Sequence, residues 1–137
     1  MKEEKIFFNK NISMMFLILI VAEIFYVSSL SFGAGPGMIT LIPFTYHVVI
    51  FFLLSFFISN LILGEKIKKS GIILSLFLSA IFAILDEVHQ IFVPFRGAGI
   101  EDVFIDSLGI FSGILILLFT KNHSKILKQS LSFLGIR

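Results

Sequence analysis

Four long apolar stretches alternate with short polar segments along the chain. Each comes near the roughly 20 residues that an α-helix needs to cross a bilayer. The first stretch follows lysines, as the core of a signal peptide does, but it is too long for one and carries Glu23, so we expect it to be a retained span. The pattern predicts an all-α bundle of four transmembrane helices in a single domain over residues 1–137. The predicted spans are residues 12–30, 44–63, 71–93 and 103–119.

Composition places this bundle in a membrane. Of the 137 residues, 57% are hydrophobic and only 15% are charged, whereas soluble domains carry about 25% charged residues. The mean hydropathy is +1.03. The absence of cysteine excludes disulfides, thiolate metal sites and cysteine nucleophiles. We therefore expect an integral membrane protein with membrane lipids as partners and with no nucleic-acid partner.

The basic residues gather on alternate polar segments. Lysines occur before the first stretch, between the second and third stretches, and in the tail after Thr120, where Arg137 also lies. Only Arg96 lies between the third and fourth stretches, so ten of the eleven basic residues fall on one side of the bundle. The positive-inside rule makes that side cytoplasmic. We predict a multi-pass protein of the cell membrane with both termini in the cytoplasm (N-in/C-in).

Two polar segments have a predicted structure of their own. The uncharged loop over residues 31–43 contains glycines and prolines that prevent a continuous helix. It forms either a lid over a cavity or an ordinary interfacial turn, and the sequence leaves both open. The tail over residues 120–137 places Leu127, Leu131 and Leu134 at helical spacing among lysines. It predicts a short basic amphipathic helix on the inner membrane surface.

Ionisable and amide side chains concentrate near the predicted outer ends of the four stretches. An acid that faced lipid at mid-bilayer would cost about 2.5–3.5 kcal/mol, so we expect these acids to face inward, to pair or to be protonated. Arg96 is the only fixed cation among them. The excess negative charge implies protonated acids, a bound cation or a cationic ligand group. The residues concerned are Glu23, His47, Asp86, Glu87, His89, Gln90, Arg96, Glu101, Asp102 and Asp106.

Helical spacing predicts how the third and fourth stretches pack. Asp102 and Asp106 are four residues apart and share a face, which continues in Gly109 and Gly113. Small residues allow membrane helices to approach closely. The third stretch carries a comparable stripe that also ends in acids, so we predict that the two stripes pack together. That stripe consists of Gly71, Ser75, Ser79 and Ala83.

The chemistry of the residue types suggests roles for the cluster. A carboxyl group acts as a general acid or base or as a metal ligand. The planar fork of Arg96 suits a phosphate or a carboxylate. The alternative is a structural clamp to Asp102 that closes the turn between the third and fourth stretches. We expect Gln90 to complete a hydrogen-bond network. A metal site stays an open alternative, although the spacing matches no established zinc motif, and the sequence leaves any cofactor unknown. The candidate catalytic residues are Asp86, Glu87, Asp102 and Asp106; the candidate ligand-binding residues are Arg96, Gln90, His47 and Glu23; the candidate metal ligands are His47, His89 and Asp106.

At these positions the chain resembles the VanZ-like family of membrane proteins. The likeness covers essentially the whole chain and departs from the family in two places: Phe44 stands where members often carry a lysine, and Glu23 is unusual in the first span. The resemblance implies a role in the cell envelope and, for glycopeptide-resistance members, resistance to teicoplanin. The matching residues are Ser28-Ser29, His47, Asp86-Glu87, Gln90, Pro94, Arg96, Asp102, Asp106, Gly109 and Gly113.

Three functions are compatible with this pattern. The first is a non-enzymatic envelope protein whose outward-facing polar cavity binds the head group of a lipid, of a lipid-linked envelope precursor or of an amphiphilic antibiotic. The second is a membrane hydrolase or transferase that uses an acid pair, with or without a metal, on a lipid-linked substrate. The third is a small ion-coupled transporter, which the lack of an internal repeat and of an interrupted helix disfavours.

Overall fold

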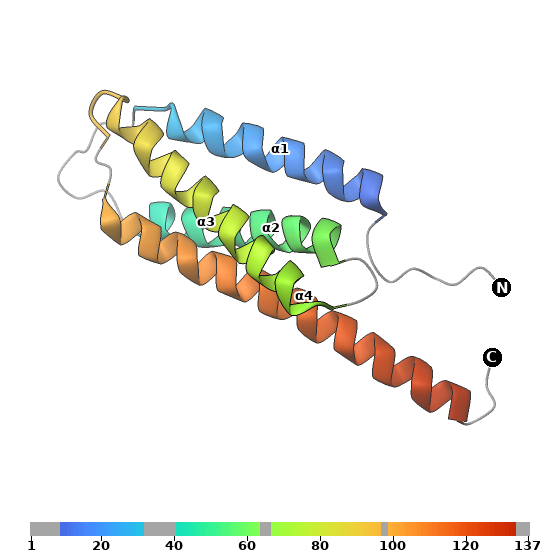
Figure 1. Cartoon of the computed structure of the whole chain (residues 1–137). Coiled ribbons are helices and arrows are strands. Elements are labelled where there is room, and N and C mark those ends of the chain that lie inside the picture. Colours follow the sequence, from blue (N-terminus) through green and yellow to red (C-terminus); the bar gives the residue numbers. More distant parts are fainter. Residues whose placement is uncertain (1–8, 32–40, 64–66, 97–98, 134–137) are drawn as a thin grey trace.

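Four helices make up most of the computed structural model, which describes residues 9–31, 41–63, 67–96 and 99–133 (Figure 1). Each of the four is long and apolar enough to cross a membrane. The predicted all-α bundle is therefore confirmed, with every helix within a few residues of its expected start. The helices are α1 (Lys10–Ser28), α2 (Leu41–Leu63), α3 (Lys69–Ile91) and α4 (Ile100–Phe133).

Local sequence explains where these helices begin and end. The side chain of Asn9 caps α1 by accepting a backbone hydrogen bond of 3.2 Å. Pro43 lies in the first turn of α2, where the missing N–H has no helical partner to lose. Pro94 follows α3 within three residues and prevents its continuation. Glu101 and Asp102 open α4, where carboxylates complement the positive end of the helix dipole.

Helix α2 is the centre of the bundle. It supplies half of the buried hydrophobic cluster, including Phe51 and Leu54, which are fully buried. The outward face of α4 shows the reverse pattern, with a stripe of exposed large side chains that suits contact with lipid. That stripe consists of Phe104, Leu108, Phe111, Leu115 and Phe119.

The glycines of α4 pack against α2 and not against α3. A Cβ placed on Gly109 would stand 2.5 Å from the carbonyl oxygen of Val48, and one on Gly113 would overlap the Phe52 carbonyl oxygen and the Ser55 hydroxyl. The prediction that this stripe packs against α3 is therefore wrong. The small residues Ser75, Ser79 and Ala83 of α3 are buried as expected.

The basic tail continues α4. Its described part, up to Phe133, is helical as predicted, but it follows the fourth span without a break and does not form a separate short helix. At 1.5 Å per residue the 34 residues of α4 span about 50 Å, well beyond the hydrocarbon thickness of about 30 Å. Figure 1 shows α4 extending past the ends of the other three helices. The loop predicted over residues 31–43 falls largely on residues 32–40, which lie outside the described residues.

The orientation of the bundle is directly testable, because the chain has no native cysteine. Phe95→Cys lies beyond the end of α3, where the side chain of Phe95 is 85% exposed; Lys125→Cys lies in the exposed part of the extended α4. The charge distribution predicts that an impermeant thiol reagent labels position 95 in intact cells and position 125 only after permeabilisation. The reverse pattern would contradict the predicted N-in/C-in orientation.

Candidate functional site

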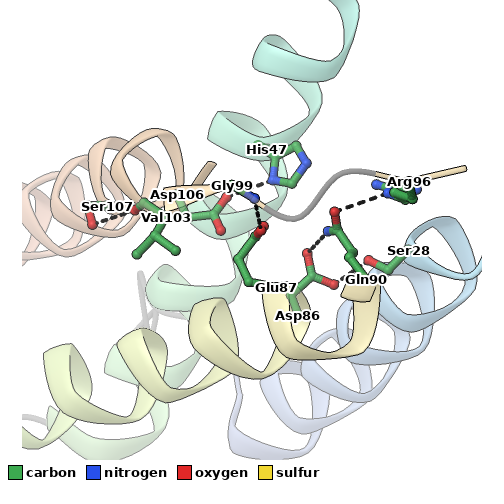
Figure 2. Close-up of polar contacts among 10 residues, drawn as sticks. All are labelled: Ser28, His47, Asp86, Glu87, Gln90, Arg96, Gly99, Val103, Asp106 and Ser107. Carbon is green, nitrogen blue, oxygen red and sulfur yellow. Dashed lines mark hydrogen bonds and ion pairs between the residues drawn. The ribbon is translucent and has the colours of Figure 1, made fainter. Parts of the chain in front are cut away.

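Most of the predicted site residues lie at one end of the bundle, where α1 and α3 finish and α2 and α4 begin. We call this the polar end (Figure 1). Asp86 and Glu87 are consecutive on α3, so their side chains leave the helix about 100° apart. Asp86 accordingly contacts α1, whereas Glu87 contacts the residue that precedes α4. Figure 2 shows the two resulting groups of contacts.

The first group joins α1 to α3 through buried polar contacts. The Ser28 hydroxyl donates a hydrogen bond to Oδ1 of Asp86. Oδ2 of Asp86 accepts one of 2.8 Å from the Gln90 amide, one helical turn later. The amide oxygen of Gln90 in turn accepts a hydrogen bond of 3.1 Å from Nε of Arg96. Gln90 thus completes a hydrogen-bond network, as the sequence suggested, and each oxygen of Asp86 has a partner within it.

Arg96 holds the end of α1. Its Nη1 donates to the carbonyl oxygens of Val27, at 2.7 Å, and Leu30, at 3.2 Å. The last carbonyls of a helix have no partner within the helix, and a cationic side chain complements the negative end of the helix dipole. These contacts make Arg96 a clamp on the end of α1, whereas the clamp predicted from sequence was to Asp102.

The half-buried His89 contacts the same end of α1. Its Nε2 lies 3.0 Å from the Ser29 hydroxyl, which also donates to the carbonyl of Phe25 at 2.7 Å. The rings of His89 and Phe25 are tilted at a centroid distance of 4.6 Å. The pair Ser28-Ser29 therefore serves two partners, Asp86 and His89, on one face of α3.

The second group joins α2 to α4 and α3. Nδ1 of His47 lies 2.8 Å from Oδ1 of Asp106, and both side chains are buried. Oε2 of Glu87 accepts a hydrogen bond of 2.9 Å from the backbone N–H of Gly99, just before α4. Three helices thus contribute to this second group, which we call the acid–histidine site: His47, Glu87 and Asp106.

Two carboxylate oxygens of the acid–histidine site have no partner among the described residues. They are Oε1 of Glu87 and Oδ2 of Asp106, both in side chains that are more than nine-tenths buried. Electrostatic repulsion acts on Glu87 from Asp86, Asp102 and Asp106. The other three candidate catalytic acids are therefore within electrostatic reach of Glu87, and Glu87 and Asp106 each have an oxygen without a partner among the described residues.

The candidate metal ligands do not come together. His47 and Asp106 are in contact, but His89 lies in the other group, with Ser29. Among the residues that the structure describes, no three His, Asp or Glu side chains are arranged to hold a metal ion. The geometry thus gives the metal-dependent hypothesis no support.

Two further residues belong to the polar end, Glu23 on α1 and Tyr46 on α2. Glu23 is exposed on α1, so of the three alternatives expected for the acids it does not follow the first, facing inward; its part in ligand binding stays a prediction. The hydroxyl of Tyr46 is buried and, among the described residues, has no hydrogen-bond partner. Sequence inspection overlooked Tyr46, whose only signal was its place beside His47.

One comparison with known proteins found a match. A family model described as VanZ/LLP1 matches residues 7–121, a stretch that includes every residue of both groups at the polar end. Neither a curated protein nor a solved structure matches the chain.

Proposed function

Since this chain belongs to the VanZ/LLP1 family, with four helices of membrane-spanning type, we propose that it is a cell-envelope protein that binds the head group of a lipid or an amphiphile at its polar end. The acid–histidine site is the binding site in this proposal. The Ser28–Asp86–Gln90–Arg96 network is the frame that holds α1 and α3 around it. Asp102, near the start of α4, adds to the negative field of the site.

The single observation that carries the proposal is the pair of spare oxygens on Glu87 and Asp106. Buried polar groups are nearly always hydrogen-bonded, and one that is not calls for an explanation. Here two oxygens of the same type lie unpartnered in side chains whose second oxygen is already held. A ligand that supplies donors accounts for both at once. The large apolar side chains exposed on the helix surfaces support a ligand that lies in or at the bilayer.

A consequence for antibiotics belongs to the same proposal. A protein that holds an envelope lipid or a lipid-linked precursor by its head group changes how accessible that molecule is to glycopeptides. We expect expression in a host with peptidoglycan to raise tolerance to teicoplanin, and Asp106→Asn to remove the increase without loss of protein. Unchanged tolerance with well-expressed protein would restrict the proposal to lipid binding.

The contact between His47 and Asp106 favours a second candidate, a hydrolase or transferase. A carboxylate that orients a histidine is a recurrent arrangement in general base catalysis, and Glu87 lies on the neighbouring helix. This candidate predicts turnover of a lipid-linked substrate by purified protein. Stable retention of an unchanged lipid would favour binding instead.

The proposal is tested by identifying the lipid that accompanies the purified protein. We expect mass spectrometry of the extracted wild-type protein to show one lipid class in near-stoichiometric amount. The double variant Glu87→Gln/Asp106→Asn removes the acceptor charges and should lose that class, while Glu101→Gln, which neutralises an exposed acid at the start of α4, should retain it. Equal lipid content in all three proteins would show only non-specific boundary lipid and would overturn the proposal.

A further inference from the structure

The two spare oxygens restrict the chemistry of the ligand. One oxygen of Glu87 is held by the Gly99 N–H at 2.9 Å, and one oxygen of Asp106 lies 2.8 Å from Nδ1 of His47. Each carboxyl group is therefore fixed in orientation, with one acceptor remaining: Oε1 and Oδ2 respectively. Figure 2 shows the two side chains meeting from α3 and α4 beside Gly99. The ligand atom that meets them has to be a donor.

Charge restricts the ligand further. Asp86, Asp102 and Asp106 all repel the Glu87 carboxylate; Asp86 and Asp102 also repel that of Asp106, which His47 attracts. The hydrogen bonds of Arg96 to Gln90, Val27 and Leu30 hold its Nε and Nη1 within the helix junction. An anionic group at this position would add to the repulsion. A cationic donor relieves the repulsion and forms charge-assisted hydrogen bonds, which are the strong class.

A primary ammonium meets these requirements better than the other common cations. It carries three N–H donors and one positive charge in a group small enough to contact two carboxylates. A trimethylammonium group has the charge but no N–H to donate. Calcium and magnesium require six or more oxygen ligands, and no three acidic or histidine side chains among the described residues are arranged to hold a metal ion.

We propose that the acid–histidine site selects a head group that carries a primary ammonium, which donates hydrogen bonds to Oε1 of Glu87 and Oδ2 of Asp106. This inference rests on the head-group binding proposed above and adds the class of head group. The same chemistry occurs in an aminophospholipid and in a free amine, and the two sources are separated by competition with soluble ethanolamine.

The test uses the full chain, purified and stripped of lipid, with three phospholipids of identical acyl chains at equal concentration. Their head groups are ethanolamine, choline and glycerol. Native mass spectrometry should show at least about tenfold more bound phosphatidylethanolamine than phosphatidylcholine, the change expected from one charge-assisted hydrogen bond. Glu87→Gln and Asp106→Asn should each remove this preference, and the exposed control Glu101→Gln should keep it.

The outcomes separate this inference from the proposal on which it rests. Equal binding of all three lipids by folded wild-type protein, or a preference for phosphatidylglycerol, would overturn the selection of ammonium and leave head-group binding intact. No binding of any lipid would overturn both. Displacement of the lipid by millimolar ethanolamine would support the ammonium site and overturn its assignment to a lipid. The wild-type comparison decides the matter even if a variant fails to fold.

Discussion

Gly113→Leu is expected to abolish the folded protein, and Gly113→Ala to lower the free energy of unfolding by about 1–3 kcal/mol, the usual cost of overpacking. The reason is the close contact between α4 and α2. Even a Cβ at position 113 would overlap the backbone carbonyl oxygen of Phe52 and the hydroxyl of Ser55. Backbone atoms in the centre of a helix cannot move aside as a side chain can. Thermal unfolding in detergent, followed by circular dichroism, measures both effects.

Gly71→Ala is the matched control for this prediction. Gly71 is also a glycine in a membrane-spanning helix, but its Cβ would stand 2.8 Å from Cδ2 of Leu63, the end of a flexible side chain. Alanine is also the better helix former by about 1 kcal/mol. We expect a change in the free energy of unfolding within about 1 kcal/mol of zero. Equal destabilisation by Gly71→Ala and Gly113→Ala would contradict the special closeness of α2 and α4.

Arg96→Gln is expected to lower the free energy of unfolding by about 2–4 kcal/mol, because hydrogen bonds from a charged donor contribute about 1.5–3 kcal/mol each. The substitution removes the contacts with Gln90 and with two carbonyls at the end of α1. Arg96→Lys should lower the free energy of unfolding by somewhat less, since lysine keeps the positive charge. It should still be destabilised, because one ammonium cannot reproduce the planar spread of donors of the guanidinium. The effect should be local: faster hydrogen exchange at the end of α1, with α4 unchanged.

The comparison that decides the role of Arg96 is between stability and head-group binding. If Arg96 is a clamp, the folded fraction of Arg96→Lys binds lipid as the wild-type protein does. Loss of binding in a variant of wild-type stability would instead make Arg96 part of the binding site, the alternative that the sequence left open. Lys125→Gln, which removes an exposed cation far along α4, controls for net charge and should change neither quantity.

The helices were predictable from sequence because each apolar run is long enough to span a bilayer and is separated from the next by polar residues. The partner of the glycine stripe was not predictable. A small-residue face shows that a neighbour approaches closely, but the pattern does not say which neighbour. The tail was also not predictable as a continuation of the fourth span: residues 120–125 are all polar, but none of them is glycine or proline, and the helix runs through them without a break.

The candidate site was also predictable only in part. Its position was predictable, because acids at similar depth on several helices must avoid lipid, and Asp86, Glu87 and Asp106 are indeed buried. The pairing within it was not, because it depends on how each helix is rotated about its axis. Consecutive acids on α3 diverge to different partners, and the exposed position of Glu23 shows that the cost of a charge in lipid does not by itself determine burial.

The packing of α2 against α4 has a consequence for biogenesis. Helices enter the membrane in the order of synthesis and associate afterwards, yet the most extensive helix contact in the bundle joins the second helix to the fourth. Until α4 arrives, His47 has no Asp106 to contact, and the α2 surface around Val48 and Phe52 lacks its glycine neighbours. The bundle is therefore completed only by the last span, α4. Before α4 has entered the bilayer, the nascent protein cannot hold a ligand between Glu87 and Asp106.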